Sequence, residues 1–238
     1  MLTWSIFAEK SVVKVRVGTG VDSQDFYVHK DLLSHHSPFF KAALSNERKE
    51  ALENVVQLPD DDVEVFRIYI CWLYGSWPFT SLASGQVDKQ GTFSIPDHDT
   101  LGSAYCFGDK VLDFDFCDMV ADMLCAHSTE LSYCPITVFA RIWKVAAVGS
   151  GPRRLIVDSY VCLAKKAWSV DLYKFEAELW QDIAEALIAD REEFVSLRSQ
   201  TVPWIKGDMC RYHLHASEEG VCYKKTKDWD QPSRLTKS

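Results

Sequence analysis

The chain has 238 residues, of which 47% are hydrophobic and 25% charged, a composition typical of a protein that folds around a core. Its 26 basic and 34 acidic residues give a net charge of −8, which argues against binding to nucleic acid or to an anionic membrane surface. No apolar run reaches the roughly 18 residues of a membrane span, and the N-terminus lacks the segments of a secretory signal. Eight cysteines in mostly apolar contexts indicate a reduced, intracellular protein, in the cytoplasm or the nucleus.

The N-terminal quarter of the chain has the pattern of short strands around a helix. In residues 11–18 valines alternate with basic residues, the period of a half-buried strand. The alternation returns at 26–29 after a turn that contains two glycines, which predicts an antiparallel hairpin. Ser37 before Pro38 predicts a capped helix start, and residues 55–58 predict a third strand.

A further helix is predicted shortly after Pro59. Asp61 and Glu64 have the spacing of a capping box, and carboxylates favour the positive end of a helix dipole. Three adjacent carboxylates at 60–62 also suggest a cation site, but they point in different directions, so capping explains them better. The apolar residues then recur at helical spacing and form a stripe, Val63, Phe66, Ile70 and Leu73.

The rest of the chain is predicted to be mainly helical. Residues 79–97 have no clear period and are expected to form an exposed loop. Residues 224–238 are expected to form a polar tail, and Asp113 is expected to cap a helix. The helices are predicted at 98–109, 113–127, 135–148, 153–166 and from 175 to about 197. In the last of them one apolar face is expected to carry Phe175, Leu179, Ile183 and Leu187.

Several blocks of sequence occur in an order that we recognise. They are Phe26-Tyr27-Val28-His29-Lys30, Leu32-Leu33-Ser34, Ser37-Pro38-Phe39-Phe40-Lys41-Ala42-Ala43-Leu44, Leu58-Pro59-Asp60-Asp61-Asp62, Phe66 and Trp72-Leu73-Tyr74. With these blocks, residues 11–127 resemble a BTB/POZ domain of the short kind common in filamentous fungi. The resemblance implies an α+β fold, in which a short sheet with surrounding helices is followed by an all-helical C-terminal half. We therefore divide the chain into a BTB/POZ domain (1–127), a helical region (128–200) and a Cys/His hairpin with a polar tail (201–238).

The same resemblance implies a non-catalytic protein–protein interaction module. Its partners would be proteins, through self-association or, in an adaptor role, through a cullin ubiquitin-ligase scaffold. The alternative is a scaffold or homo-oligomeric regulator with no ligase link and a small C-terminal structural zinc site. Only ten residues precede Ser11, too few for the N-terminal helix and strand that dimers of this family exchange, so that dimer is not expected. Neither nucleic acid nor a membrane is an expected partner.

Catalytic chemistry is not indicated by the histidines and most of the cysteines. His29 before Lys30 suggests an acid/base pair, but a histidine that ends a strand and satisfies a neighbouring group explains it better. His35 and His36 are expected in a partly exposed turn. A small enzyme built on cysteine and histidine stays an alternative without a paired nucleophile and base to support it. The cysteines expected to act as small core residues are Cys71, Cys106, Cys117, Cys125 and Cys162.

One cluster near the C-terminus has the composition of a metal site. Cys210, His213, His215 and Cys222 place four soft or borderline ligands within thirteen residues. Zinc prefers four such groups in a tetrahedron, so a structural zinc site is predicted, with no spare position for catalysis. His213 and His215 share a face only in an extended segment, which favours a hairpin. The competing interpretation is a surface hairpin with incidental cysteine and histidine.

Overall fold

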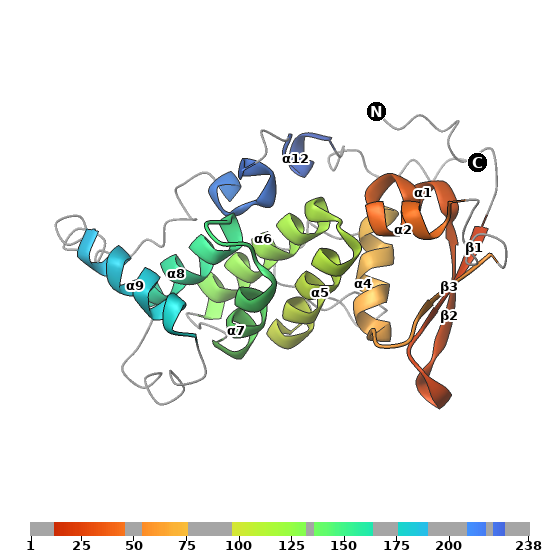
Figure 1. Cartoon of the computed structure of the whole chain (residues 1–238), viewed down its shortest axis with the longest axis horizontal. Helices are drawn as coiled ribbons and strands as arrows, with labels where there is room; N and C mark the ends of the chain where they lie inside the picture. Colours follow the sequence, from red (N-terminus) through yellow and green to blue (C-terminus); the bar gives the residue numbers. More distant parts are fainter. Residues whose placement is uncertain are drawn as a thin grey trace. The chain divides into compact units, whose positions relative to one another are not determined.

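The computed structural model describes most of the chain, in residues 12–45, 54–75, 97–131, 136–163, 176–189, 209–217 and 221–226. The chain forms two compact units. One is built from residues 1–96, 107–116 and 221–238, and the other from residues 97–106 and 117–220. The expected α+β fold, a short sheet with helices followed by a mostly helical region, is confirmed (Figure 1).

The sheet has three strands, β1 (Val12–Val17), β2 (Gln24–His29) and β3 (Val55–Leu58), in the order β2-β1-β3. β1 and β2 pair antiparallel with Val15 opposite Phe26, which confirms the predicted hairpin. β3 pairs parallel with β1, a relation that no local pattern indicates. One face of the sheet is closed to solvent, and its residues that are at most 2% exposed are Val13, Val15, Val17, Val28, Val56 and Leu58.

The opposite face of the hairpin carries charge and one exposed aromatic ring. Arg16 Nε lies 2.6 Å from Asp25 Oδ1, and Lys14 Nζ lies 3.4 Å from the other carboxylate oxygen. The hydrogen bond from Arg16 is the main reason why the pKa of Asp25 is lowered to about 2. Tyr27 lies beside this charged group and is 71% exposed.

Helices α1 (Lys30–His36) and α2 (Pro38–Ala43) follow the hairpin. The predicted start of α2 is confirmed, because Ser37 Oγ accepts a hydrogen bond from the Phe40 backbone N–H at 3.1 Å. The turn expected at His35 and His36 is instead the last turn of α1. The sequence pattern missed this helix because it has only seven residues, with Leu32 and Leu33 buried inside it.

The cap of helix α4 (Val63–Leu73) differs from the prediction by one residue. Asp62 Oδ1 accepts hydrogen bonds from the backbone N–H groups of Glu64 at 2.7 Å and Val65 at 3.1 Å. Asp62 is therefore the N-cap, and the predicted capping box at Asp61 is wrong. Asp61 instead pairs with Lys110 Nζ at 2.6 Å. Spacing alone could not separate adjacent aspartates, because the extended backbone at Asp62 decides which one caps.

The core of the first unit is largely aromatic. Phe66 packs against Phe26 with ring centroids 5.0 Å apart, and Tyr69 packs against Phe116 at the same distance. Trp72 is fully buried. Two of the predicted stripe residues, Val63 and Ile70, are only half-buried, since the buried face of α4 is centred on the residues Val65, Phe66, Tyr69, Trp72 and Leu73.

A buried carboxylate joins α4 to the start of helix α6 (Phe114–Leu131). Asp113 is 2% exposed, and its Oδ2 accepts hydrogen bonds from Tyr69 Oη at 3.1 Å and Trp72 Nε1 at 3.3 Å. Its Oδ1 accepts from the backbone N–H of Phe116 at 3.0 Å, which confirms the predicted cap. Three donors therefore satisfy a charge that would otherwise be costly to bury.

The remaining long helices agree with the predicted ones within a few residues where both ends are described, whereas the predicted ends at 166 and near 197 lie outside the described residues. Helix α9 (Ala177–Ala189) buries Leu179 and Ile183, as predicted, but Leu187 on the expected apolar face is 43% exposed. Phe175, also expected on that face, lies outside the described residues. The other helices are α5 (His98–Val111), α7 (Ile136–Val145) and α8 (Gly151–Leu163).

Arginine 153 holds the helical region together at one buried point. Arg153 lies over the ring of Trp143, with Cζ 4.3 Å from the ring centroid, and its Nε donates to the Ala146 carbonyl at 2.9 Å. Its Nη1 lies 2.8 Å from a carboxylate oxygen of Glu178 in α9. One side chain therefore links α7, α8 and α9.

The C-terminal described residues form short helical turns, η5 (Met209–Tyr212), η6 (Leu214–Ser217) and α12 (Tyr223–Thr226). The expected extended hairpin is therefore wrong for residues 209–217. The expected polar tail begins with the helical turn α12, and residues 227–238 lie outside the described part. The loop expected at 79–97 also lies outside it, except for Asp97. Among the helices that the structure describes, none has the length and apolar character needed to cross a membrane.

Replacing Asp113 with alanine is expected to lower the free energy of unfolding by about 3 kcal/mol, because two buried donors and a helix cap lose their acceptor. Urea denaturation of the Asp113→Ala variant measures the loss. The exposed Asp60→Ala variant is the control, and it should change stability by less than about 0.5 kcal/mol. Equal stability of the two variants would contradict the role given to Asp113.

The Arg16→Gln change is expected to raise the pKa of Asp25 from about 2 toward its ordinary value, because the hydrogen bond that favours the carboxylate is lost. The paired carboxylate favours the folded state above its unfolded pKa, and this contribution is lost as the pH falls toward 2. A carboxyl NMR titration measures the shift. Lys14→Gln is the matched control and should raise the same pKa less.

Candidate functional site

The acid/base pair that His29 and Lys30 suggest is not supported by the geometry. His29 Nδ1 lies 2.7 Å from Tyr74 Oη, and the same oxygen accepts a hydrogen bond from the His29 backbone N–H at 3.2 Å. Tyr74 follows α4, so this contact joins the end of β2 to the end of that helix. His29 therefore has the structural role expected for a histidine that ends a strand.

The described cysteines outside the C-terminal cluster lie wholly or partly inside the fold. Cys117 and Cys125 are buried, and Cys71, Cys106 and Cys162 are half-buried. No disulfide joins any of the seven cysteines that the structure describes. Burial raises the pKa of the Cys71 thiol, the opposite of what a nucleophile needs.

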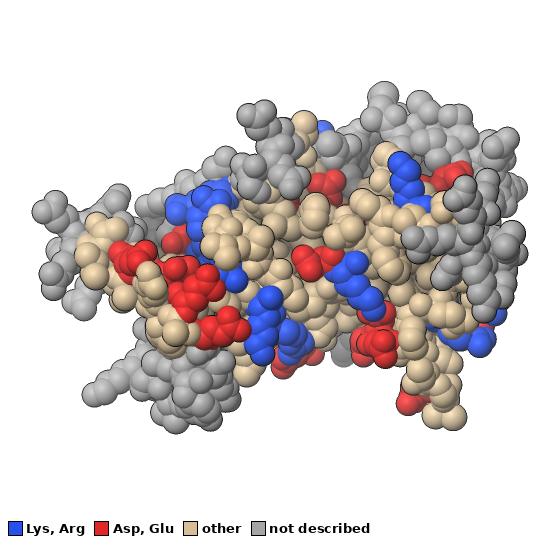
Figure 2. Space-filling view, viewed as in Figure 1, with Lys and Arg blue, Asp and Glu red and all other residues tan. Residues whose placement is uncertain are grey.

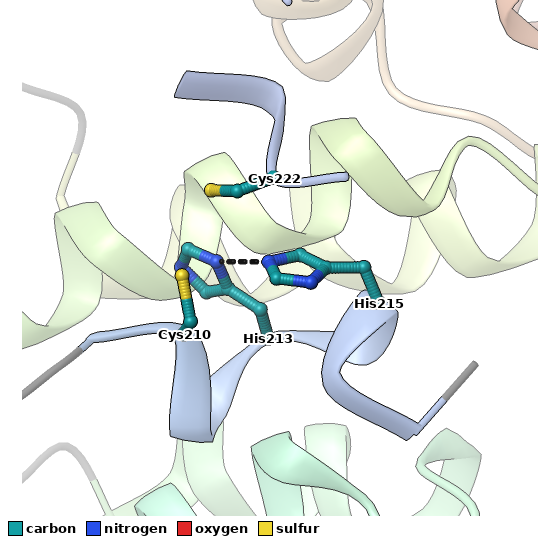
Figure 3. A group of neighbouring side chains, drawn as sticks. All are labelled: Cys210, His213, His215 and Cys222. Carbon is teal, nitrogen blue, oxygen red and sulfur yellow. Dashed lines mark hydrogen bonds between the residues drawn. The ribbon is translucent and has the colours of Figure 1, made fainter. Parts of the chain in front are cut away.

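The C-terminal cysteines and histidines come together in space. One ligand atom from each of Cys210, His213, His215 and Cys222 lies within 4.8 Å of the others. Figure 3 shows the four side chains turned toward one another. His213 is fully buried and Cys222 is 4% exposed, while Cys210 and His215 are half-buried.

Short 3₁₀ turns produce this convergence where a hairpin was expected. The His213 backbone N–H donates to the Cys210 carbonyl at 3.1 Å, the i→i+3 bond of a 3₁₀ turn. With three residues per turn, positions 210 and 213 lie on one face. η6 then carries His215 back toward His213, and the ring nitrogens His213 Nδ1 and His215 Nε2 are 3.0 Å apart (Figure 3).

Two carboxylates of α6 lie beside these histidines. Asp122 Oδ1 is 3.0 Å from His213 Nε2, and Asp118 Oδ1 accepts a hydrogen bond from the Leu214 backbone N–H. Asp118 Oδ2 lies 3.9 Å from both His213 Nδ1 and His215 Nε2. The Asp118 side chain is 1% exposed and that of Asp122 is 12% exposed. Both ring nitrogens of His213 therefore have a polar neighbour.

Tyrosine 212 anchors the segment in the helical region. The ring is fully buried among Ala121, Cys125 and Leu155, and its hydroxyl donates to Asp158 Oδ2 at 2.8 Å. Burial, followed by the charge of Asp158, raises the pKa of Tyr212 far above its usual range. The hydroxyl is therefore protonated at neutral pH and can donate to Asp158.

Glycine at position 151 permits this close packing. A Cβ atom at Gly151 would lie 2.4 Å from the backbone carbon of Tyr212 and 2.7 Å from the carbonyl oxygen of His213. The start of α8 therefore rests directly on the backbone that carries the cluster. Only a residue without a side chain fits there.

The spacing of cysteine and histidine in the sequence predicts the four candidate ligands but does not reveal Asp118 and Asp122. These residues are 91 or more positions away from their partners, so spacing could not connect them. One signal was present. The two carboxylates are four residues apart in the otherwise apolar run Phe116–Leu124, which places them on one face of a helix. Charged residues in such a run are seldom buried unless they have a polar partner.

The surface carries mixed charge and a few exposed apolar side chains. Figure 2 shows basic and acidic residues intermixed on one face. The ion pairs of the described residues include Lys110–Asp61 and Arg141–Asp99. A few large hydrophobic side chains of the described residues are exposed to solvent. They include Val21 at 98%, Val148 at 78% and Tyr27 at 71% exposure.

Comparison with known proteins identifies the N-terminal part. Residues 10–89 match the BTB/POZ domain family. The chain is also similar to the TD and POZ domain-containing protein 3 of Mus musculus, with 37% identity over 54 residues. This match covers 23% of the chain and 15% of the mouse protein. The chain therefore contains a BTB/POZ domain, which confirms the resemblance, while its likeness to fungal proteins stays a prediction.

A BTB/POZ domain is a protein-interaction module that is generally non-catalytic. The chain therefore carries such a module in its N-terminal part, where the three-stranded sheet and helices α1, α2 and α4 lie. The Cys/His cluster lies outside the matched residues 10–89. The domain match therefore does not explain that cluster.

Replacing Gly151 with alanine is expected to lower the free energy of unfolding by about 1–3 kcal/mol, since the added methyl group meets rigid backbone. Thermal or urea denaturation measures this loss. The control is Arg154→Ala, an exposed position in the same helix, which should stay within about 0.5 kcal/mol of the wild type. A stable Gly151→Ala protein would show that residues 212–213 do not rest on α8.

Proposed function

We propose that this protein is a non-catalytic adaptor that acts in the cytoplasm or the nucleus. Its BTB/POZ domain would bind a cullin ubiquitin-ligase scaffold, and its helical region would recruit the target. The observation that carries the proposal is the BTB/POZ domain itself, because members of this family dock onto partner proteins. The alternative is a scaffold or homo-oligomeric regulator with no ligase link.

Tyrosine 27 is the surface residue that we expect to contribute most to binding. Tyr27 is 71% exposed on β2, next to the charged group of Arg16 and Asp25. Exposed tyrosine is a frequent binding hot spot, because its ring buries a large area at a small cost in side-chain entropy. Val21, in the turn between β1 and β2, is 98% exposed as well.

One observation favours the alternative of self-association. β2 lies at an edge of the described sheet, with β1 as its neighbour there. An edge strand offers backbone donors and acceptors to a strand of another chain. A second copy of this chain could therefore use the same strand and the same tyrosine.

The test is a titration of the full chain against the purified N-terminal domain of a BTB-binding cullin. We expect micromolar or tighter affinity, about −8 kcal/mol or better. Tyr27→Ala should weaken binding at least about tenfold, whereas Val148→Ala, an equally exposed control in the helical region, should leave it unchanged.

No binding at high micromolar cullin would refute the adaptor proposal. Sedimentation of the same samples then tests the alternative. A dimer of the wild type that Tyr27→Ala weakens would support a self-associating scaffold, and a monomer at all concentrations would exclude it.

A further inference from the structure

We propose that Cys210, His213, His215 and Cys222 hold a structural zinc ion. The proposal concerns the C-terminal cluster and does not depend on the partner of the BTB/POZ domain. It goes beyond the sequence pattern, because the structure adds the spatial convergence of the four ligands and a second layer of carboxylates around them.

The distances suit a tetrahedral site with small adjustments. Four ligand atoms at 2.0–2.3 Å from zinc lie about 3.3–3.8 Å from one another. His213 Nδ1 and His215 Nε2 are 3.0 Å apart, close to the shortest of these edges. All four ligand atoms lie within 4.8 Å of one another, so rotations of the cysteine side chains suffice to close the tetrahedron.

Asp122 supplies the hydrogen bond that a zinc-binding histidine ordinarily makes. When His213 Nε2–H donates to Asp122 Oδ1 at 3.0 Å, the proton is on Nε2 and the lone pair of Nδ1 is available. That lone pair faces His215 Nε2, and the zinc ion would bind to these two nitrogens. A carboxylate that holds the far nitrogen of a metal-binding histidine fixes both its tautomer and its orientation. We therefore assign Asp122 as a positioning residue.

The charge around the site favours a cation. Asp118 is 1% exposed, and its Oδ2 lies 3.9 Å from each of the facing ring nitrogens. A carboxylate oxygen this close to the ring nitrogens favours the binding of a cation to those nitrogens. Zinc binding would release two thiol protons, and the ion with two thiolates and two neutral imidazoles would carry no net charge.

The ligand types select zinc and indicate a structural role. Thiolate and imidazole suit zinc, whereas magnesium and calcium prefer oxygen. Four protein ligands leave no open position for a substrate. The segment consists of 3₁₀ turns, which are too short to be stable alone, so metal binding would add the free energy that holds them.

Two metal-free arrangements compete with this proposal. The facing histidines can share a hydrogen bond, and Cys210 and Cys222 can be oxidised to a disulfide. The hydrogen bond involves only the two histidines and the disulfide only the two cysteines, whereas a zinc site uses all four side chains. The experiment therefore measures metal and thiols in the same sample.

The full chain is purified under reducing conditions, without chelator and with any polyhistidine tag removed. We expect one zinc ion per chain by elemental mass spectrometry. After exchange with Co²⁺, we expect the ligand-field bands of a tetrahedral ion and a thiolate-to-cobalt charge-transfer band. Cys222→Ser should lose the zinc and the charge-transfer intensity of one thiolate. Cys162→Ser, a half-buried cysteine outside the cluster, should keep both.

A second pair of variants tests the positioning role of Asp122. Asp122→Ala should weaken zinc affinity about 10–100-fold, while the cobalt spectrum at saturation stays tetrahedral. Asp122→Asn keeps an acceptor for the His213 Nε2–H and should recover part of the affinity. Equal affinity of both variants and the wild type would overturn this assignment.

The zinc proposal fails if the wild-type protein contains no zinc and added Co²⁺ produces no charge-transfer band. It also fails if the protein, purified without reductant and then unfolded, has two titratable thiols fewer than the reduced protein, and Cys222→Ser removes this difference. Retention of zinc and of the full spectrum in Cys222→Ser would overturn the ligand set.

Discussion

The buried carboxylate of Asp113 is the interaction on which the first unit depends. It accepts hydrogen bonds from Tyr69 and Trp72 in the middle of the aromatic core, and it caps α6 through Phe116. A carboxylate at 2% exposure is tolerated only when its oxygens accept hydrogen bonds. Here three donors bond to the two oxygens of Asp113. The position of α4 against the start of α6 is therefore set by directional bonds as well as by apolar packing.

The second unit uses buried carboxylates in a different way. Asp118 and Asp122 of α6 hold the segment of residues 209–217 through one backbone N–H and one imidazole. Tyr212 fixes the same segment in the core, with its hydroxyl on Asp158. Part of the acidic surplus of this chain thus serves inside the fold, where each carboxylate orients a particular donor.

The proposed zinc ion and the BTB/POZ domain have separate roles in the protein. The BTB/POZ domain is a protein-interaction module, and we propose that its partner binds at the exposed surface around Tyr27. The cluster concerns a segment of short turns that has few backbone hydrogen bonds of its own. Coordination by four side chains, with Asp122 behind His213, would make that segment rigid without giving it a reaction to catalyse.

The sequence by itself determined the elements whose signal is local. Alternating valines predicted β1, Ser37 and Asp113 predicted two helix caps, and the four candidate ligands were found from spacing alone, since each pattern lies within a few residues. The tertiary structure decided the parallel pairing of β3 with β1, the cap at Asp62, and the 3₁₀ turns that bring His213 to His215. It also decided the role of Asp118 and Asp122. These features depend on contacts between residues far apart in the chain or on the backbone conformation at one position, and neither is encoded in a local pattern.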